Sequence, residues 1–504
     1  MKTTSSKTRI LSALLAALIL SGSLASCATG GTASDTTENP FIPPETETVS
    51  LISDDLPEDL YYDDDEVTII CRTESSWTVS EIAVDGLKSE PVNDSIFERN
   101  KAVEERLGVK LISMQESGGS GSALDKVVVA VKGGSKDYDI LADCSHQIIS
   151  ASLSGCFADL RTTEFIDFDQ IWWTQGFHDA VEYKGSQYAL LGSMLLSMYR
   201  FGFITVFNKS LFDDATQPYL YEYVENGTWT LDKQAQLVPL FHVDDGNGKQ
   251  DWNGLDTYGL VTSSYTSLDA YWSACQLDIL RRDDDGNYRL VMDIEKLHDV
   301  VDKIQHLYYN TENGTLDALP DSGDDAIFSL IRTLFTENHA AMATIRLMEM
   351  ENSVMRNMEQ EYGIVPMPKY DEQQDGYYTM LHDQFTAVSI PATVTGDRLT
   401  EMSAVLEAMS SASYHIVKPA YYETTLRTKL AQDPQSAEMI DIISDNIYID
   451  AGILLIHELG AYHHGFRNIV KSRTNSTASL YKAKNAACTK SLERICKSLD
   501  RLMK

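Results

Sequence analysis

The chain has 504 residues, of which 43% are hydrophobic and 23% are charged. This composition is typical of a folded globular protein and excludes a disordered, collagenous or multi-span membrane chain. The net charge of −34 disfavours nucleic acid as a partner, because so acidic a chain is repelled by phosphate backbones.

The first residues predict export and a lipid anchor. Three basic residues precede an apolar run over residues 10–20, which is too short to span a bilayer. The run leads to Leu24-Ala-Ser-Cys27, which resembles the lipobox of bacterial lipoproteins. In that family the signal peptide is cleaved before the cysteine, which carries a diacylglycerol and often a further chain such as palmitate. We therefore expect a signal peptide over residues 1–26 and a protein anchored through acylated Cys27 on the extracytoplasmic side of the cell membrane. An ordinary secretory signal with a chance cysteine is the alternative.

Residues 27–65 are expected to form a flexible tether. They are rich in Ser, Thr, Asp and Glu and contain no Lys or Arg, so they cannot bury enough apolar surface to fold. The six cysteines beyond Cys27 form no CxxC pair and are expected to be free thiols, with Cys144–Cys156 pairing as the alternative.

Alternating strand and helix patterns predict an α/β fold from residue 66 onward. The first part reads as three strands (66–71, 109–114, 138–142) separated by two helices, one from Asn93 or Asp94 to Gly108 and one from Ser122 to Gly133. This βαβαβ order favours a parallel sheet with helices on both faces. Further elements are then expected: strands over 203–208, 340–345, 363–367 and 385–390, a helix over 230–238, a hairpin turn at 282–287, a helix over 327–335, and helices after Arg398.

Short patterns spread over the chain resemble one family of proteins. They are Glu104-Glu-Arg-Leu-Gly-Val109, Tyr138-Asp-Ile-Leu141, Phe157-Ala-Asp-Leu160, Tyr183-Lys-Gly-Ser-Gln-Tyr188, Phe207-Asn-Lys-Ser-Leu-Phe212, Gly227-Thr-Trp-Thr-Leu-Asp232 and Glu361-Tyr-Gly-Ile-Val-Pro-Met-Pro368. Their order, behind a lipobox, resembles the extracellular solute-binding proteins of ABC importers, family 1, the sugar-binding type.

The resemblance implies a two-lobe periplasmic-binding-protein type II fold, also called a Venus flytrap. Lobe 1 would comprise residues 66–195 plus 370–414, and lobe 2 residues 196–369 plus 415–504, with hinge crossovers between them. It further implies a monomer that closes on a small solute, a mono- or oligosaccharide, and delivers it to the permease of an ABC transporter without any chemical reaction.

Candidate ligand contacts follow from the sheet, because ligands bind beyond the carboxyl ends of parallel strands. Polar groups that bind hydroxyls and flat rings that cover C–H faces suit a sugar. Arg346 at the end of the strand over 340–345 calls for either a carboxylate partner or an anionic ligand. The candidates are Arg72, Ser76 and Trp77 after the first strand, Asp143 and His146 after the third, Tyr199 near the first crossover, Trp272, Arg346, and Asp383.

No catalytic motif, metal site or cofactor is predicted. His457-Glu458 lacks the second histidine of HExxH, and the neighbouring His463 and His464 are expected to face solvent. The acidic turns between Asp244 and Asp256 lack the spacing of an EF-hand. The alternatives are a secreted hydrolase acting on surface glycans, or a binding protein for a peptide, a polyamine or a phosphorylated sugar.

Overall fold

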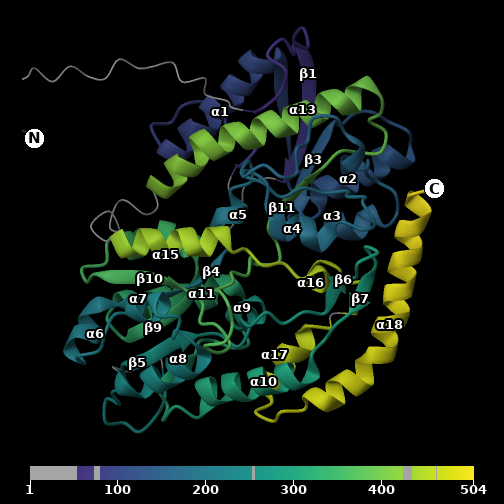
Figure 1. Cartoon of the computed structure of the whole chain (residues 1–504). Coiled ribbons are helices and arrows are strands. Elements are labelled where there is room, and N and C mark those ends of the chain that lie inside the picture. The colour runs from purple at the N-terminus through teal and green to yellow at the C-terminus, as the bar shows by residue number, and fades with distance from the viewer. Residues whose placement is uncertain (1–53, 73–79, 252–255, 424–433, 461) are drawn as a thin grey trace, which may run out of the picture. The chain divides into compact units, whose positions relative to one another are not determined.

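The structure, a computed structural model, describes residues 54–72, 80–251, 256–423, 434–460 and 462–504 (Figure 1). The predicted signal peptide, Cys27, most of the predicted tether, and the candidate contacts Ser76 and Trp77 lie outside these residues. Ser50–Lys504 form one compact unit by themselves. Among the described helices, none combines the length and the apolar character needed to cross a bilayer.

The first sheet has four strands in the order β11-β3-β1-β2. β1 (Asp65–Arg72) pairs in parallel with β2 (Val109–Glu116) and with β3 (Ile140–Cys144), as the βαβαβ pattern predicts. β11 (Thr386–Ser389) comes from a much later part of the chain and pairs antiparallel with β3. The predicted parallel sheet is therefore confirmed, and an antiparallel strand forms one of its edges.

The end of α1 (Pro91–Leu107) follows the prediction, but its start does not. Gly108 ends the helix with φ of 62°, in the left-handed region that favours glycine. The start is capped by Glu90, whose carboxylate accepts hydrogen bonds from the backbone of Val92 and Asn93, so the predicted cap lies inside the first turn. Proline at the first helical position explains the shift, because its fixed φ suits that position.

Residues 54–64 belong to the predicted tether by composition, yet they contact α1. Leu56 is buried, and the Arg106 guanidinium donates to the backbone carbonyls of Leu56 and Pro57 at 3.2 and 3.0 Å. Arg106 also pairs with Asp54 at 3.4 Å. One buried leucine and one multiply bonded arginine therefore attach this acidic segment to the folded body.

The second sheet has five strands in the order β10-β4-β9-β5-β8. β5 (Tyr258–Thr262) runs parallel to β9 (Ala340–Arg346) and β8 (Thr315–Asp317), whereas β4 (Phe203–Asn208) runs antiparallel to β9 and β10 (Tyr362–Pro366). Every residue of β4, β5, β9 and β10 is buried, as expected for strands covered on both faces. The predicted bounds of β4, β9 and β10 lie within one residue of the observed bounds, whereas β5 and β8 were not predicted.

Local signals also position elements around the second sheet. Thr230 caps α8 (Leu231–Leu237) by accepting from the backbone of Lys233, as predicted. The predicted turn at 282–287 joins the hairpin strands β6 (Leu280–Arg282) and β7 (Tyr288–Leu290). α11 (Asp324–Thr336) contains the predicted apolar stripe and packs against β9. The remaining helices are α2 (Ser122–Lys132), α3 (Ser145–Ser152), α4 (Gln175–Val181), α5 (Ser197–Arg200), α6 (Lys209–Asp214), α7 (Leu220–Glu225), α9 (Thr266–Ala274), α10 (Ile294–Tyr309), α12 (Ser353–Arg356), α13 (Asp397–Ala412), α15 (Pro434–Asp445), α16 (Ala451–Leu454), α17 (His464–Lys471) and α18 (Thr477–Leu502).

Two chain segments connect the sheets, and a third lies beside them. Residues 197–203 lead into β4, and residues 379–385 lead back into β11. Single bridges join Gly202 to Leu381 and Thr379 to Ile447, so these segments and the one after α15 lie next to one another. α13 then packs against α1, next to the first sheet.

All six cysteines among the described residues are free thiols, as predicted. Cys144 and Cys156 are both buried and unbridged, which excludes their pairing in this structure. Burial raises the pKa of the Cys144 thiol to about 11, so it stays protonated at neutral pH.

Candidate functional site

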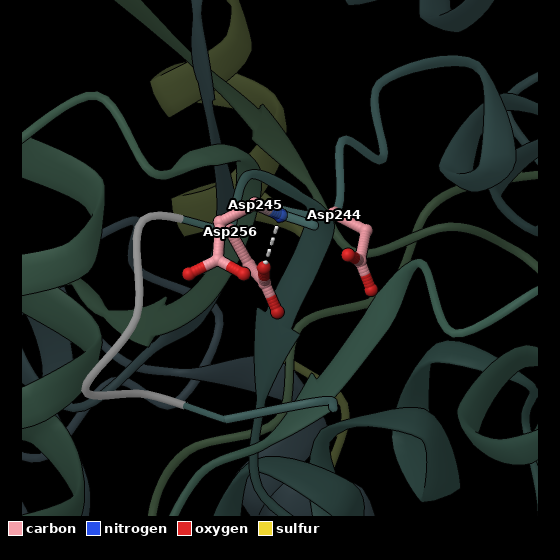
Figure 2. Close-up of side chains that lie close together, drawn as sticks. All are labelled: Asp244, Asp245 and Asp256. Carbon is pink, nitrogen blue, oxygen red and sulfur yellow. Dashed lines mark hydrogen bonds between the residues drawn. The ribbon is translucent and has the colours of Figure 1, made fainter. Parts of the chain in front are cut away.

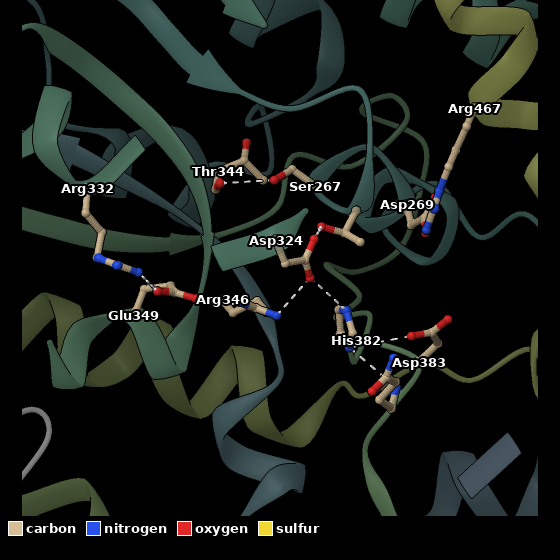
Figure 3. Close-up of polar contacts among 12 residues, drawn as sticks. Ser267, Asp269, Asp324, Arg332, Thr344, Arg346, Glu349, His382, Asp383 and Arg467 are labelled. Carbon is tan, nitrogen blue, oxygen red and sulfur yellow. Dashed lines mark hydrogen bonds and ion pairs between the residues drawn. The ribbon is translucent and has the colours of Figure 1, made fainter. Parts of the chain in front are cut away.

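A network of buried charges lies at the carboxyl end of the second sheet (Figure 3). β9 ends at Arg346, whose guanidinium pairs with Asp324 at 3.2 Å and with Glu349 at 2.7 Å. The side chains of Arg346 and Asp324 are only 3% and 5% exposed. Asp324 also accepts from the Thr266 hydroxyl at 2.7 Å and lies 3.2 Å from His382 Nε2. The end of β9, the start of α11 and the segment before β11 thus place their polar side chains in contact with one another.

Asp324 remains ionised in this network. Burial opposes its charge, but the hydrogen bond and charge of His382, together with Arg346, outweigh burial and lower the pKa of the carboxyl group. The Arg346 guanidinium also lies 4.1 Å from the centre of the Phe328 ring, so it is held by charge on one side and by an aromatic face on another.

A cavity of about 410 Å³ opens beside this network. Three arginines and three carboxylates line it, and Phe328 adds an aromatic face. Arg200 binds Glu351 through two contacts of 2.8 Å, and Arg332 binds Glu349. The cavity thus offers hydrogen-bond donors and acceptors whose charges balance, which suits a polar but uncharged ligand. Its lining consists of Arg200, Asp325, Phe328, Ser329, Arg332, Arg346, Met348, Glu349, Glu351 and Asn352.

Asp383 lies next to this network and is partly exposed, with its carboxylate 3.5 Å from His382 Nδ1. Burial opposes its charge, but the nearby His382, His146 and Arg467 together outweigh burial and lower the pKa of Asp383. A carboxylate in this position can accept hydrogen bonds from hydroxyl groups.

Arg467 of α17 comes near the same place through a pairing that sequence reasoning missed. It binds Asp269 of α9 in a two-point contact, with Nε 2.7 Å from Oδ1, and it stacks over the Tyr265 ring at 4.6 Å. The expectation that His463 faces solvent is wrong: this side chain is 1% exposed, because it packs against Trp272 and beside Asp269. Burial lowers the pKa of His463 to about 4, so the ring is neutral, and neither of its nitrogens has a hydrogen-bond partner among the described residues.

At the carboxyl end of the first sheet, the predicted contacts have different surroundings. The Asp143 carboxylate accepts from the backbone N–H groups of Gly121, Leu124 and Cys144 at 2.7 to 3.0 Å. These bonds fix the loop before α2. His146 lies in the first turn of α3, and with Asp383 it lines a second, much smaller cavity.

Arg72 connects the first sheet to the segment that leads into β11. Its guanidinium donates to the Gln384 carbonyl at 2.8 Å and to the Thr386 hydroxyl at 2.6 Å. Of the two arginines predicted as ligand contacts, Arg346 lines the cavity of about 410 Å³ and Arg72 does not. Arg346 has the carboxylate partner that the sequence offered as one of two alternatives.

Two predicted aromatic contacts are buried elsewhere. Tyr199 donates to the Ser193 hydroxyl at 2.9 Å and lines a separate cavity of about 430 Å³. Trp272 donates its indole N–H to Asp450 at 3.3 Å and packs against Phe466. The residues that sequence reasoning missed are Asp324, Arg332, Glu349 and Arg467; only Glu349, three positions after Arg346, had a local signal.

Three carboxylates in the loop before β5 could hold a cation. Asp244, Asp245 and Asp256 each place an oxygen within 4.8 Å of the others (Figure 2). Asp256 is buried and already accepts from the Asp245 backbone at 2.9 Å and from the Tyr258 hydroxyl at 3.0 Å. Their chemistry would suit a hard cation such as Ca²⁺, which prefers oxygen ligands.

Comparison with solved structures identifies the fold. No protein-family model matches the chain, and no curated protein matches it by sequence. The galacto-N-biose and lacto-N-biose I-binding protein of an ABC transporter from Bifidobacterium longum superposes with a TM-score of 0.55 at 12% identity, over 86% of this chain and 98% of that one. A family 1 extracellular solute-binding protein from Bifidobacterium longum subsp. infantis gives 0.53 at 10% identity, over 84% and 99%. An ABC transporter solute-binding protein from Thermotoga lettingae, bound to α-D-tagatose, gives 0.51 at 16% identity, over 85% and 100%. The chain therefore has the two-lobe α/β fold of ABC sugar-binding proteins, as the sequence patterns predicted.

Proposed function

We propose that this protein is a lipid-anchored solute-binding protein that captures a small carbohydrate outside the cell membrane and delivers it to the permease of an ABC transporter. The observation that carries the proposal is the cavity of about 410 Å³ at the end of the second sheet. It combines balanced charges with an aromatic face, in a fold shared with proteins that were solved with lacto-N-biose and with α-D-tagatose. Hydroxyl-rich neutral ligands need this mixture of groups.

The proposed mechanism is closure of the two lobes around the solute. A ligand that contacts the cavity around Arg346 on one side, and Asp383, Arg72 and His146 on the other, would bind the closed form better than the open form. That difference in affinity is what shifts the population toward closure. Micromolar affinity corresponds to about 8 kcal/mol, which a few hydrogen bonds and one stacked ring in a dry cleft can supply.

The test uses the compact unit, residues 50–504, with a panel of neutral mono- and oligosaccharides. We expect at least one sugar to raise the melting temperature, to bind in calorimetry, and to reduce the radius of gyration in solution scattering. If no neutral sugar binds and a peptide, a polyamine or a sugar phosphate does, the proposed ligand class is wrong and the bound class takes its place. Hydrolysis of a bound glycan would identify an enzyme instead.

Matched variants locate the site. Asp383→Asn should weaken sugar binding about tenfold or more, because it removes one charge-assisted acceptor. Asp375→Asn makes the same change at an exposed position where the carboxylate contacts Tyr378, and it should leave the affinity unchanged. Trp77→Ala should weaken binding without lowering the melting temperature, if its ring stacks on the sugar.

The anchor has a separate test. Cys27→Ser in the full chain should prevent acylation and release the protein from the membrane fraction after export. Continued membrane attachment of a cleaved, unacylated chain would contradict the proposed anchor without bearing on the sugar site.

A further inference from the structure

The last helix differs in charge from the rest of the protein. Residues 477–504, which contain α18 (Thr477–Leu502), carry seven Lys or Arg and two acidic residues, a net charge of +5. The whole chain carries −34, so the other residues together carry −39. A strongly basic element on so acidic a protein needs a physical reason.

α18 is the yellow helix close to the C-terminus in Figure 1. Six of the seven basic residues in 477–504 fall on one face of this helix and of the turn after it, which we call the basic face. At 100° per residue, its members fall within about a third of the helix circumference. All of them are exposed. The opposite face is apolar and buried, and α18 packs against α10, α17 and β7. The basic face consists of Lys482, Lys490, Arg494, Lys497, Arg501 and Lys504.

Neighbouring acids do not neutralise the basic face. Among the described residues, none of its six side chains forms an ion pair. Both acids of this segment, Glu493 and Asp500, fall in the same third of the helix, but Asp500 pairs with Lys184 of another part of the chain at 2.6 Å. The six basic residues still exceed the two acids by four charges on this face. The helix dipole favours cations at the carboxyl end of a helix, but that effect is confined to the last turn and leaves Lys482, Lys490 and Arg494 unexplained.

We propose that the basic face docks on the surface of an anionic phospholipid bilayer. From Lys482 to Arg501 the face extends along about 30 Å of helix, at 1.5 Å per residue. Such a line of charge matches a plane of many phosphates, whereas a single bound anion would need donors that converge on one point. The face carries no large apolar group, so the contact is electrostatic adsorption without insertion.

The acidic remainder of the protein does not prevent this contact. Charges are screened beyond about 8 Å at physiological ionic strength, so residues on other faces act weakly on a surface that α18 touches. Repulsion of those faces would instead help to orient the folded body, with α18 toward the membrane. This inference goes beyond solute binding, and its test needs neither the solute nor the acyl chain.

The test measures co-sedimentation of residues 50–504 with vesicles made of equal parts phosphatidylglycerol and phosphatidylcholine. We expect binding that weakens steeply as salt is added, and no binding to vesicles of phosphatidylcholine alone. The triple variant Lys490→Gln, Arg494→Gln, Lys497→Gln should bind roughly a hundredfold more weakly, because each basic residue near the surface contributes about a factor of five. Glutamine has a helix propensity close to that of Lys and Arg, so circular dichroism should show an intact helix.

The matched control is Lys126→Gln, Lys132→Gln, Lys136→Gln, three exposed lysines in or just after α2. It removes the same charge from another face and should leave vesicle binding within about twofold of the unmodified protein. Equal loss in both triple variants, binding to neutral vesicles, or no binding to anionic vesicles at low salt would overturn the proposal. Soluble glycerol phosphate should not compete, and full competition by it would assign the face to isolated phosphates instead.

Discussion

At the carboxyl end of the first sheet, the Asp143 carboxylate is held by three backbone N–H groups of its own lobe. At the carboxyl end of the second sheet, Asp324 and Glu349 share the guanidinium of Arg346 beside an open cavity. The backbone bonds fix one loop conformation and engage both oxygens of Asp143. The ion pairs place Arg346 and Glu349 in the lining of that cavity. The same position in two similar sheets therefore fixes a loop in one lobe and lines a cavity in the other.

Like Asp143, a second buried acid near the first sheet accepts hydrogen bonds from N–H groups and has no cationic partner among the described residues. Glu407 of α13 is 1% exposed and accepts from the indole N–H groups of Trp172 and Trp173 at 2.8 and 3.0 Å. No arginine contacts it among the described residues. Burial without a cation raises the pKa of Glu407 to about 8.

The largest effect should come from breaking the charge network of the second sheet. Arg346→Met leaves Asp324 and Glu349 buried with fewer partners, and loss of one member of a buried ion pair costs about 3–5 kcal/mol. Urea unfolding of residues 50–504 measures this loss. Arg332→Met is the matched control, because Arg332 also binds Glu349 but is more exposed, and it should cost clearly less. Equal losses of unfolding free energy in the two variants would mean that the burial of Arg346 does not determine how much it contributes to stability.

The next effect is a pH dependence that arises from Glu407. Its pKa is raised in the folded state, so the folded protein binds a proton that the unfolded chain has released, and stability falls as pH rises from about 4.5 to about 8. The free energy of unfolding should fall by at most about 1.4 kcal/mol per pH unit from this group. Glu407→Gln removes the titrating group and should flatten the profile, although its N–H₂ group replaces one of the two oxygens that accept from the indoles. An unchanged slope in the variant would assign the dependence to other groups.

A smaller effect is expected at Asp143. In Asp143→Asn one carboxylate oxygen becomes an N–H₂ group that cannot accept from the backbone, and an unsatisfied buried donor costs about 1–3 kcal/mol. Sugar affinity of the folded protein should stay the same, because Asp143 acts on the loop before α2. Calorimetry below the melting temperature measures the sugar affinity of the folded protein separately from its stability. A large loss of affinity with unchanged stability would place Asp143 in the ligand site.

The smallest effect on stability should come from His146. Burial lowers the pKa of this ring, although Asp383 opposes the shift, and its Nδ1 has no partner among the described residues. His146→Gln should therefore change the melting temperature little. If His146 meets the ligand from the first sheet, sugar affinity should fall severalfold in the same variant, whereas unchanged affinity would leave recognition to the second sheet alone.

The sequence by itself determined the local structure and the order of the elements. Continuous apolar runs predicted β4 and β9, Gly108 predicted the end of α1, and Thr230 predicted the start of α8, because each depends on neighbouring residues only. It also placed Arg346 at the carboxyl end of the strand over 340–345, since the carboxyl ends of parallel strands are a property of topology.

Only the tertiary structure decided which charges meet and which side chains are buried. Arg346 reaches Asp324 across 22 residues, and Arg467 reaches Asp269 across 198. His463 is buried because α17 packs beside α9, and the short strand β8 forms only as a neighbour of β5. These outcomes depend on packing between distant elements, and the free energy of such contacts is not encoded in any local pattern.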